Sequence, residues 1–81
     1  METDIRAGQK VYSSDGQKLG TVKDITGIDG QLYFAIDVSL RPDYWLAGRW
    51  IHHSEIVDGE DRLFLDLSRD LLNQYKLPRP A

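Results

Sequence analysis

The sequence predicts an all-β fold: a small curled antiparallel sheet or barrel of five to six strands, followed by one short C-terminal helix. Three observations favour it. Glycine-bounded turns recur at short intervals, the apolar residues between them alternate or form short runs, and only the last regular segment has helical spacing. The chain has 81 residues, 41% of them hydrophobic and 28% charged, which is typical of a single globular domain spanning residues 1–81.

The first two strands are expected over residues 9–13 and 18–26. The dipeptide Asp15-Gly16 between them favours the tight turn of a β-hairpin. Gly20 interrupts the second strand, whose apolar residues do not alternate strictly. A β-bulge near Gly20 explains this slip, because one extra residue shifts the register. The residues before the first strand are polar, and Ile5 is their one apolar anchor.

The third strand is expected over residues 31–39, after a second glycine-bounded turn at 27–30. Its alternation is the clearest in the chain and predicts a core-facing set: Leu32, Phe34, Ile36 and Val38. On the other face, Asp37 should meet solvent, and Tyr33 and Ala35 should be half covered. We expect this strand at the centre of the sheet, because it has the best apolar face and lacks proline and glycine.

Residues 40–48 are interpreted as a loop, because Arg41-Pro42-Asp43 breaks the strand. A fourth strand is expected over 49–52 and a short turn over 53–56. An acidic hairpin loop at 58–61 then leads into the last strand, 62–67.

Ser68 is expected to cap a helix over residues 69–76, whose apolar stripe consists of Leu71, Leu72 and Tyr75. The predicted core therefore covers residues 8–76, and residues 77–81 are expected to form a loose tail.

Composition excludes several classes of protein. The net charge is −3 and no run of lysine or arginine exists, which argues against direct nucleic-acid binding. No cysteine is available for a disulfide or a thiolate zinc site. No apolar stretch reaches membrane-spanning length, and the acidic start is not typical of a signal peptide. We therefore expect a cytoplasmic protein that does not insert into membranes.

The region of the first two expected strands contains an ordered series of residues, mostly glycine and apolar: Gly8, Val11, Asp15-Gly16, Leu19-Gly20, Val22 and Asp24-Ile25. This series resembles the opening signature of the PRC-barrel family. The resemblance continues through 50–52 and 54–56 and ends at 63–68, so it covers most of residues 8–70. The family is named for the cytoplasmic part of the photosynthetic reaction centre H subunit, and it includes the C-terminal domain of the ribosome maturation factor.

The resemblance implies a binding or assembly module with no catalytic residues and no cofactor. It also implies five fold-defining residues: Gly8, Asp15, Gly16, Gly20 and Val22. The chain departs from the family at His52-His53, where members often have proline. It departs again at residues 43–46, an aromatic segment that is longer and more apolar than a connection needs.

His52, His53 and Glu55 are the only cluster with metal-ligand side chains. Adjacent residues of a strand point to opposite faces, so we expect that the two rings cannot easily reach one ion. No metal site is predicted. These residues are instead interpreted as ordinary surface or half-buried side chains, and no second catalytic group accompanies them, so we predict that the protein is not an enzyme.

The aromatic segment and its flanking arginines are the candidate protein interface. The candidate residues are Arg41, Tyr44, Trp45, Leu46, Arg49 and Trp50. Tryptophan and tyrosine bury large areas at interaction hot spots, and arginine pairs with carboxylates or stacks on rings. The alternative interpretation is that these aromatic residues plug one end of the core, and the two interpretations are compatible.

The sequence therefore predicts a non-enzymatic module that acts through protein–protein contacts and assembles as a homodimer or higher oligomer. Two alternatives stay open. One is an adaptor in RNA or ribosome maturation that binds a ribosomal protein. The other is a metal- or ligand-responsive sensor that uses His52 and His53.

Overall fold

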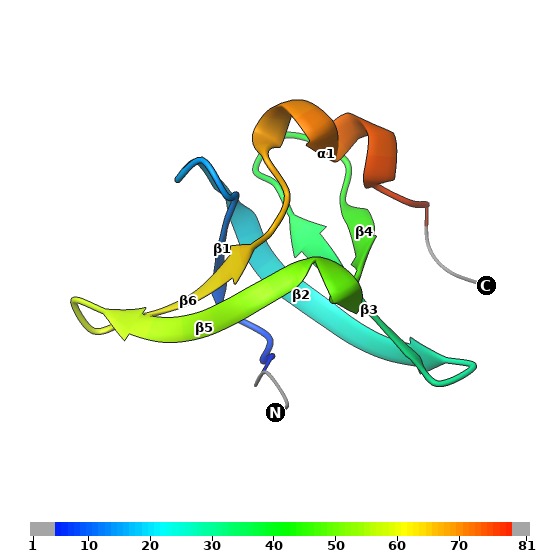
Figure 1. The fold of residues 1–81 in the computed structure, drawn as a ribbon, viewed down its shortest axis with the longest axis horizontal. Helices are drawn as coiled ribbons and strands as arrows, with labels where there is room; N and C mark the ends of the chain where they lie inside the picture. Colours follow the sequence, from blue (N-terminus) through cyan, green and yellow to red (C-terminus); the bar gives the residue numbers. More distant parts are fainter. Residues whose placement is uncertain (1–4, 79–81) are drawn as a thin grey trace.

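The computed structural model describes residues 5–78, and residues 1–4 and 79–81 lie outside the described residues. The elements in chain order are β1 (Lys10–Tyr12), β2 (Lys18–Ile28), β3 (Gln31–Asp37), β4 (Tyr44–Ala47), the 3₁₀ helix η1 (Gly48–Trp50), β5 (Ile51–Val57), β6 (Glu60–Leu65) and α1 (Arg69–Tyr75). Six strands curl into one sheet with α1 packed at one end (Figure 1). The predicted fold class is therefore confirmed.

The sheet is open and mixed. Its strand order is β4-β3-β2-β1-β6-β5, so β4 and β5 are its two edges. Four of the five strand pairings are antiparallel, and β1 pairs with β6 in parallel. The β2–β3 and β5–β6 hairpins extend in opposite directions from the centre (Figure 1). The expectation of antiparallel pairing alone is wrong for β1 and β6, because a parallel partner 52 positions away leaves no local signal: Lys10 pairs with Arg62.

The core lies on the concave side of the curled sheet and beneath α1. Its buried members are Val11, Leu19, Val22, Phe34, Ile36, Leu46, Leu63, Leu65, Leu67 and Leu72. Partly buried side chains pack around it, including Ile5, the predicted anchor of the chain before β1, and Val38. Burial of these apolar groups supplies the main driving force for folding.

The expectation that Leu32 lines the core is wrong, because its side chain is 38% exposed. Leu32 pairs with Gly27 near the tip of the β2–β3 hairpin, beyond the stretch where β4 pairs with β3. The hairpin tip therefore extends past the core. Ala35 is buried rather than half covered, since β3 is flanked by β2 and β4 and stands one place from the sheet edge.

The bulge predicted near Gly20 is confirmed. Val11 pairs with Gly20 and Tyr12 pairs with Lys18, so Leu19 is the extra residue on β2. A side chain at Gly20 would collide with the carbonyl oxygen of Asp37 and lie 2.8 Å from Cγ2 of Ile36. The missing side chain therefore lets β2 approach the end of β3 closely.

The first turn joins β1 to β2 and also contacts the start of the helix. Gly16 adopts φ 81° and donates its N–H to the Ser13 carbonyl at 3.0 Å. The Asp15 carboxylate accepts hydrogen bonds from the Ser13 hydroxyl and from the backbone N–H of Arg69. Ser68 stands at the N-cap position, as predicted, but its side chain makes no capping hydrogen bond. The Asp15 carboxylate supplies the capping acceptor in place of the Ser68 hydroxyl. This hydrogen bond holds the β1–β2 turn against the start of the helix.

Three predicted segments of the chain are wrong. Residues 44–47, interpreted as loop, form β4, and the predicted strand over 49–52 is replaced by η1 followed by β5. The predicted turn at 53–56 lies inside β5. β4 was not recognised as a strand because both of its faces are covered. Its residues are therefore consecutively apolar and do not alternate with polar ones. β5 was not recognised because its residues His53-Ser54-Glu55 are polar, as is common in a strand at an exposed edge.

The C-terminal helix is confirmed to within one residue. Leu72 faces the core, whereas Leu71 is 44% exposed and Tyr75 38% exposed, so the predicted apolar stripe is only partly buried. Leu77, placed in the loose tail by the prediction, exchanges two backbone hydrogen bonds with Trp45, at 3.0 and 2.8 Å. Residues 79–81 of that tail lie outside the described residues.

Gly20→Ala should lower the free energy of unfolding by about 1–3 kcal/mol, because the added methyl group has no space against β3. Gly27→Ala is the matched control, since its methyl group would meet only the Gln31 carbonyl oxygen, at 3.8 Å. Urea denaturation of both variants measures the difference. Equal midpoints for the two variants would contradict the proposed close approach.

Candidate functional site

The structure divides the aromatic segment between core and surface. β4 pairs with β3 along its whole length, and Leu46 is completely buried while Trp45 is 8% exposed. Tyr44 and Trp50 are half buried, and Arg41 and Arg49 are exposed. Trp45 and Leu46 thus serve as structural packing, as in the end-plug interpretation, and four of the six candidate interface residues keep accessible surface.

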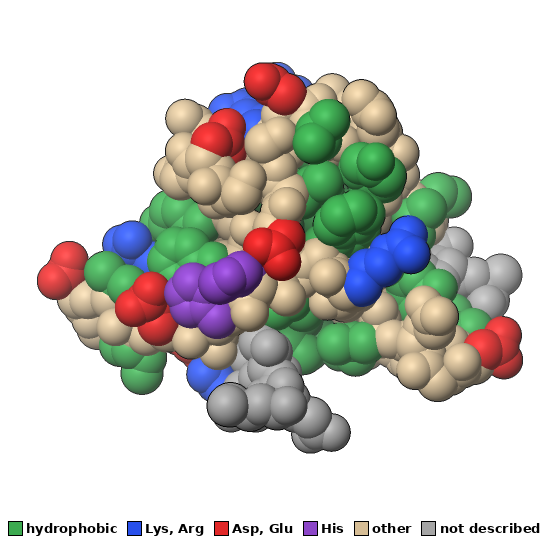
Figure 2. Space-filling model, viewed as in Figure 1, with side chains coloured by type: hydrophobic (Ala, Val, Ile, Leu, Met, Phe, Trp, Pro, Cys, Tyr) green, Lys and Arg blue, Asp and Glu red, His purple; other side chains and the backbone are tan. Residues whose placement is uncertain are grey.

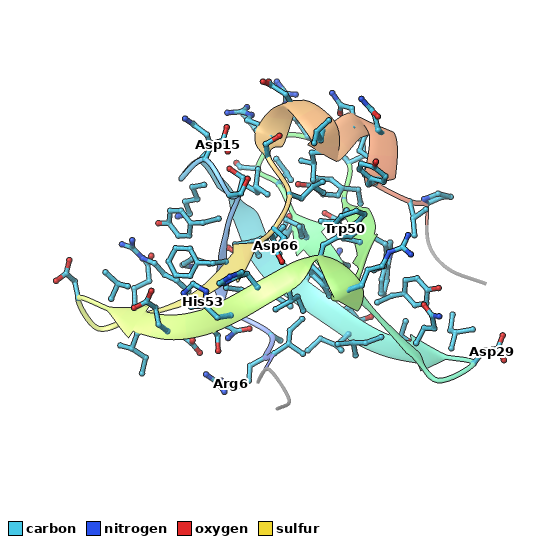
Figure 3. The ribbon with its side chains drawn as sticks, in the orientation of Figure 1. Arg6, Asp15, Asp29, Trp50, His53 and Asp66 are labelled. Carbon is cyan, nitrogen blue, oxygen red and sulfur yellow. The ribbon has the colours of Figure 1, made fainter. Side chains whose placement is uncertain are left out.

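Trp50 is the aromatic centre of that accessible surface. Its ring packs against Tyr75 of α1 at a centroid distance of 4.7 Å, and the Arg49 guanidinium lies 5.3 Å from the ring centroid. Figure 3 places Trp50 below α1 and beside Asp66, whose N–H donates to the Trp50 carbonyl at 2.7 Å. Hydrophobic side chains gather in this region of the surface (Figure 2). The contact with Tyr75 fixes η1 to the helix.

Tyr44, the first residue of β4, lies near the C-terminal end of the same helix. The Lys76 ammonium is 5.8 Å from the Tyr44 ring centroid, which is within cation–π distance. Burial raises the pKa of the Tyr44 phenol to about 12, so its hydroxyl stays protonated across the physiological range. Tyr44 therefore offers a hydrogen-bond donor and a cation-binding ring face at the end of β4.

The expectation that the two histidine rings point apart is wrong. Nδ1 of His52 lies 2.6 Å from Nδ1 of His53, so one of the two nitrogens carries the shared proton. The β5–β6 register shifts between Ile51 and His53, which makes His52 the extra residue of a bulge. A bulge turns neighbouring side chains toward the same side of a strand. Figure 2 shows both rings at the surface, beside acidic side chains.

His53 is held by its neighbours. Its ring stacks on Phe64 at a centroid distance of 4.8 Å, and its Nε2 lies 3.1 Å from a carboxylate oxygen of Glu55. Within residues 5–78, however, no group of three histidine, cysteine, aspartate or glutamate side chains could hold a metal ion. A metal bound at the two Nδ1 atoms would therefore lack a third ligand from this part of the chain.

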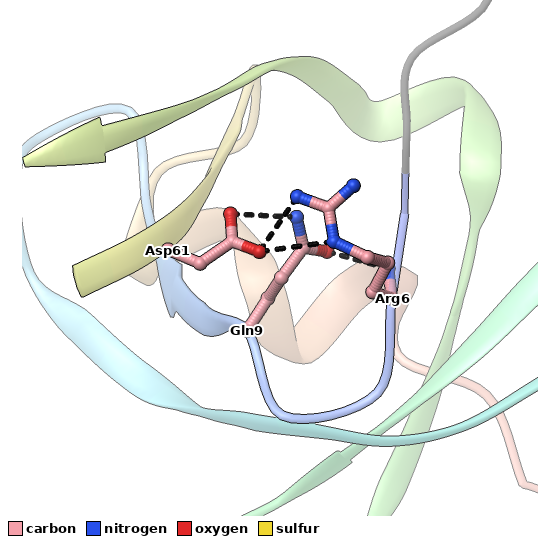
Figure 4. Close-up of polar contacts among 3 residues, drawn as sticks. All are labelled: Arg6, Gln9 and Asp61. Carbon is pink, nitrogen blue, oxygen red and sulfur yellow. Dashed lines mark hydrogen bonds and ion pairs between the residues drawn. The ribbon is translucent and has the colours of Figure 1, made fainter. Parts of the chain in front are cut away.

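A polar cluster that the sequence analysis missed connects the N-terminal segment to β6. Arg6 donates two hydrogen bonds to Oδ2 of Asp61, at 3.1 and 2.7 Å, and the Gln9 amide donates to Oδ1 at 3.2 Å (Figure 4). These contacts hold the pKa of Asp61 below its ordinary 3.8, with Arg6 as the larger cause. The partners lie 55 positions apart for Arg6 and Asp61, so no local pattern predicts their contact.

Glu60 makes a second link between the acidic hairpin and β1. It accepts hydrogen bonds from Arg62 at 2.8 Å and from the Tyr12 hydroxyl at 3.2 Å. Burial raises the pKa of Glu60, but these two hydrogen bonds outweigh it and the net shift is downward. The hairpin predicted at 58–61 is confirmed as a turn at Asp58-Gly59. Two of its acidic side chains are held by β1 and the segment before it.

The family model for the PRC-barrel domain matches residues 7–72. The chain belongs to this family. No curated protein and no solved structure matches the chain at the significance required. The PRC-barrel sheet of this chain is open rather than closed, with β4 and β5 at its two edges. The family is one of non-catalytic modules, which fits a chain whose conspicuous side chains are aromatic and basic.

The described helices are too short and too polar to cross a membrane. The cytoplasmic setting expected from the sequence stays a prediction.

Low pH should lower the free energy of unfolding of this PRC-barrel domain, partly because the Asp61 carboxylate becomes protonated. A carboxylate whose folded-state pKa is depressed contributes stability above its unfolded pKa, near 3.8, and loses that contribution as the pH falls through the folded pKa. Asp61→Asn should therefore lower stability at neutral pH and flatten the loss of stability below about pH 4. Melting temperatures measured from neutral pH to pH 2 test this.

Asp29→Asn is the control for this titration. Asp29 sits at the exposed β2–β3 turn and forms no ion pair within the described residues. Its variant should follow the wild-type pH profile. If Asp61→Asn follows that profile as well, the Arg6–Asp61 contact makes no contribution to acid stability.

Proposed function

We propose that this PRC-barrel domain is a non-enzymatic module that acts through protein–protein contacts and self-associates along the β5 edge of its sheet. One observation carries the proposal: within residues 5–78, one edge of the open sheet is covered and the other is not. The C-terminal segment covers β4 through the hydrogen bonds between Leu77 and Trp45. β5 pairs with β6 on one side, and no strand of residues 5–78 pairs with its other side.

The geometry of β5 supports addition of a strand. The two-residue turn at Asp58-Gly59 makes Val57 and Glu60 a hydrogen-bonded pair, so the N–H and C=O groups of Ser54 and Ile56 point away from β6. The Ile56 side chain is 70% exposed. An uncovered row of backbone donors and acceptors beside an exposed apolar side chain is a template for pairing with another chain.

A second copy of the chain is the occupant that the charges favour. Antiparallel β5 strands related by a two-fold axis at Ser54 would place His53 opposite Glu55 of the second copy. A register centred on Glu55 would instead oppose two carboxylates, which is destabilising. A two-fold interface repeats each contact, so the favourable pair occurs twice.

The accessible part of the aromatic segment continues this edge. η1 runs directly into β5, which places Arg49 and Trp50 at the N-terminal end of the edge strand. These two side chains would extend the contact beyond the backbone pairing, as expected for arginine and tryptophan at interaction hot spots. The ribosome-maturation adaptor and the histidine-based sensor stay predictions, and no contact among the described residues favours them over self-association.

Ser54→Pro should convert the assembly to a monomer, because it removes an outward N–H and leaves the hydrogen bonds to β6 intact. Ile56→Lys should do the same by placing a charge on each side of the two-fold axis. Light scattering over a concentration series measures the mass, and circular dichroism confirms that both variants fold.

Leu71→Lys is the matched control, because Leu71 is an exposed apolar residue of α1 away from β5. It should keep the wild-type mass. A wild-type chain that stays monomeric throughout the series would contradict the proposal. A chain dissociated by Leu71→Lys but not by Ser54→Pro would place the interface on the helix instead.

A further inference from the structure

A hollow of about 610 Å³ opens between α1, the β3–β4 connection and the start of β2. No residue of β5 lines it, so it is separate from the proposed edge of self-association. Buried Leu19 and Leu72, with partly exposed Val38 and Leu77, give it apolar walls. Its volume lies within the range of small-molecule sites, roughly 300–1,000 Å³.

Four cationic residues line this hollow: one from the start of β2, one from the β3–β4 connection and two from the two ends of α1. They are Lys18 at the start of β2, Arg41 in the β3–β4 connection, Arg69 at the start of α1 and Lys76 just after its end. The chain as a whole carries a net charge of −3, with ten lysines and arginines in all. Four of these ten basic residues lie around one concavity. They make the local electrostatic potential positive although the chain as a whole is negatively charged.

Two of these cations have weak partners: the Lys76 ammonium lies 5.8 Å from the Tyr44 ring centroid, and the charge of Lys18 acts electrostatically on Glu60. None of the four cations forms an ion pair within residues 5–78. Asp43 is the one carboxylate in the lining, and Lys23 pairs with it at 2.5 Å. Asp15 lies near Arg69, but its carboxylate is already held by the Ser13 hydroxyl and the Arg69 backbone N–H.

The remaining polar groups of the lining also favour an anion. The Tyr44 hydroxyl is protonated at neutral pH, and burial raises the pKa of the phenol further, to about 12. The Asn73 side-chain amide supplies a further donor. Apart from the neutralised Asp43, every polar side chain of the lining can donate a hydrogen bond.

We propose that this hollow binds a small organic anion whose phosphate or carboxylate groups contact the four cations and whose carbon skeleton rests on the apolar walls. Charge-assisted hydrogen bonds from lysine and arginine are the strong contacts for such groups. The site is a compact concavity and not an extended basic stripe, which favours a small ligand over a nucleic-acid backbone.

Binding would also fasten the helix to the sheet. Arg69 and Lys76 stand at the two ends of α1, whereas Lys18 and Arg41 belong to the strands and their connection. α1 otherwise meets the core through buried Leu72 and through the contact of Tyr75 with Trp50. An anion that contacts both sets should therefore raise the melting temperature, since it binds only the folded state.

Isothermal titration calorimetry with inorganic pyrophosphate and with citrate, at constant ionic strength, tests the proposal and distinguishes phosphate from carboxylate recognition. We expect saturable binding of at least one probe, accompanied by a higher melting temperature. Arg41→Gln and Arg69→Gln should each weaken that binding about tenfold, as expected for the loss of one charge-assisted hydrogen bond. Arg41 is exposed and forms no ion pair within residues 5–78, so its variant should fold.

Arg49→Gln is the matched control, because it removes the same charge from an exposed arginine outside the hollow. Its affinity for the probe should equal that of the wild type. The proposal is overturned if neither probe binds saturably up to about 10 mM, where even a millimolar site would fill. It is also overturned if Arg49→Gln weakens binding as much as Arg41→Gln does, because the effect would then be general charge screening.

Discussion

The parallel pairing of β1 with β6 is the interaction on which the rest of the structure depends. It joins the β2-β3-β4 half of the sheet to the β5-β6 hairpin, two parts that no other strand pairing within residues 5–78 connects. Val11 and Leu63 face each other in this pairing, and both are completely buried. The pairing is long-range and central, so its formation creates the core as well as the sheet.

The side chains around this pairing reinforce it. Tyr12 stacks on Phe64 at a centroid distance of 5.7 Å, and the Arg62 guanidinium lies 4.7 Å from the Tyr12 ring centroid. Glu60 and Asp61 bind Tyr12 and Arg6, which lie on β1 and just before it. Surface ion pairs are individually weak. Here they help to set the register of β1, because a strand of three residues forms too few backbone hydrogen bonds to define its register alone.

Joining the two halves through β1 leaves the sheet open, and this decides where contacts can form. β4 and β5 become edges, and the described part of the chain covers only β4, by returning through α1 to Leu77. That same return places the two ends of α1 beside the β3–β4 connection and creates the basic hollow. The uncovered edge and the hollow therefore have one origin, the path of the chain after β6.

The sequence by itself determined the fold class, the family, the first hairpin turns, the bulge near Gly20 and the helix, because glycine positions and the spacing of apolar residues act over a few neighbours. It did not reveal β4, whose residues are apolar on both faces, or β5, whose polar residues suit an edge. Only the tertiary structure decided that Trp45 and Leu46 are buried and that a bulge brings His52 and His53 together. It also decided that distant cations share one hollow. These features depend on contacts between distant residues, and local sequence patterns carry no record of such contacts.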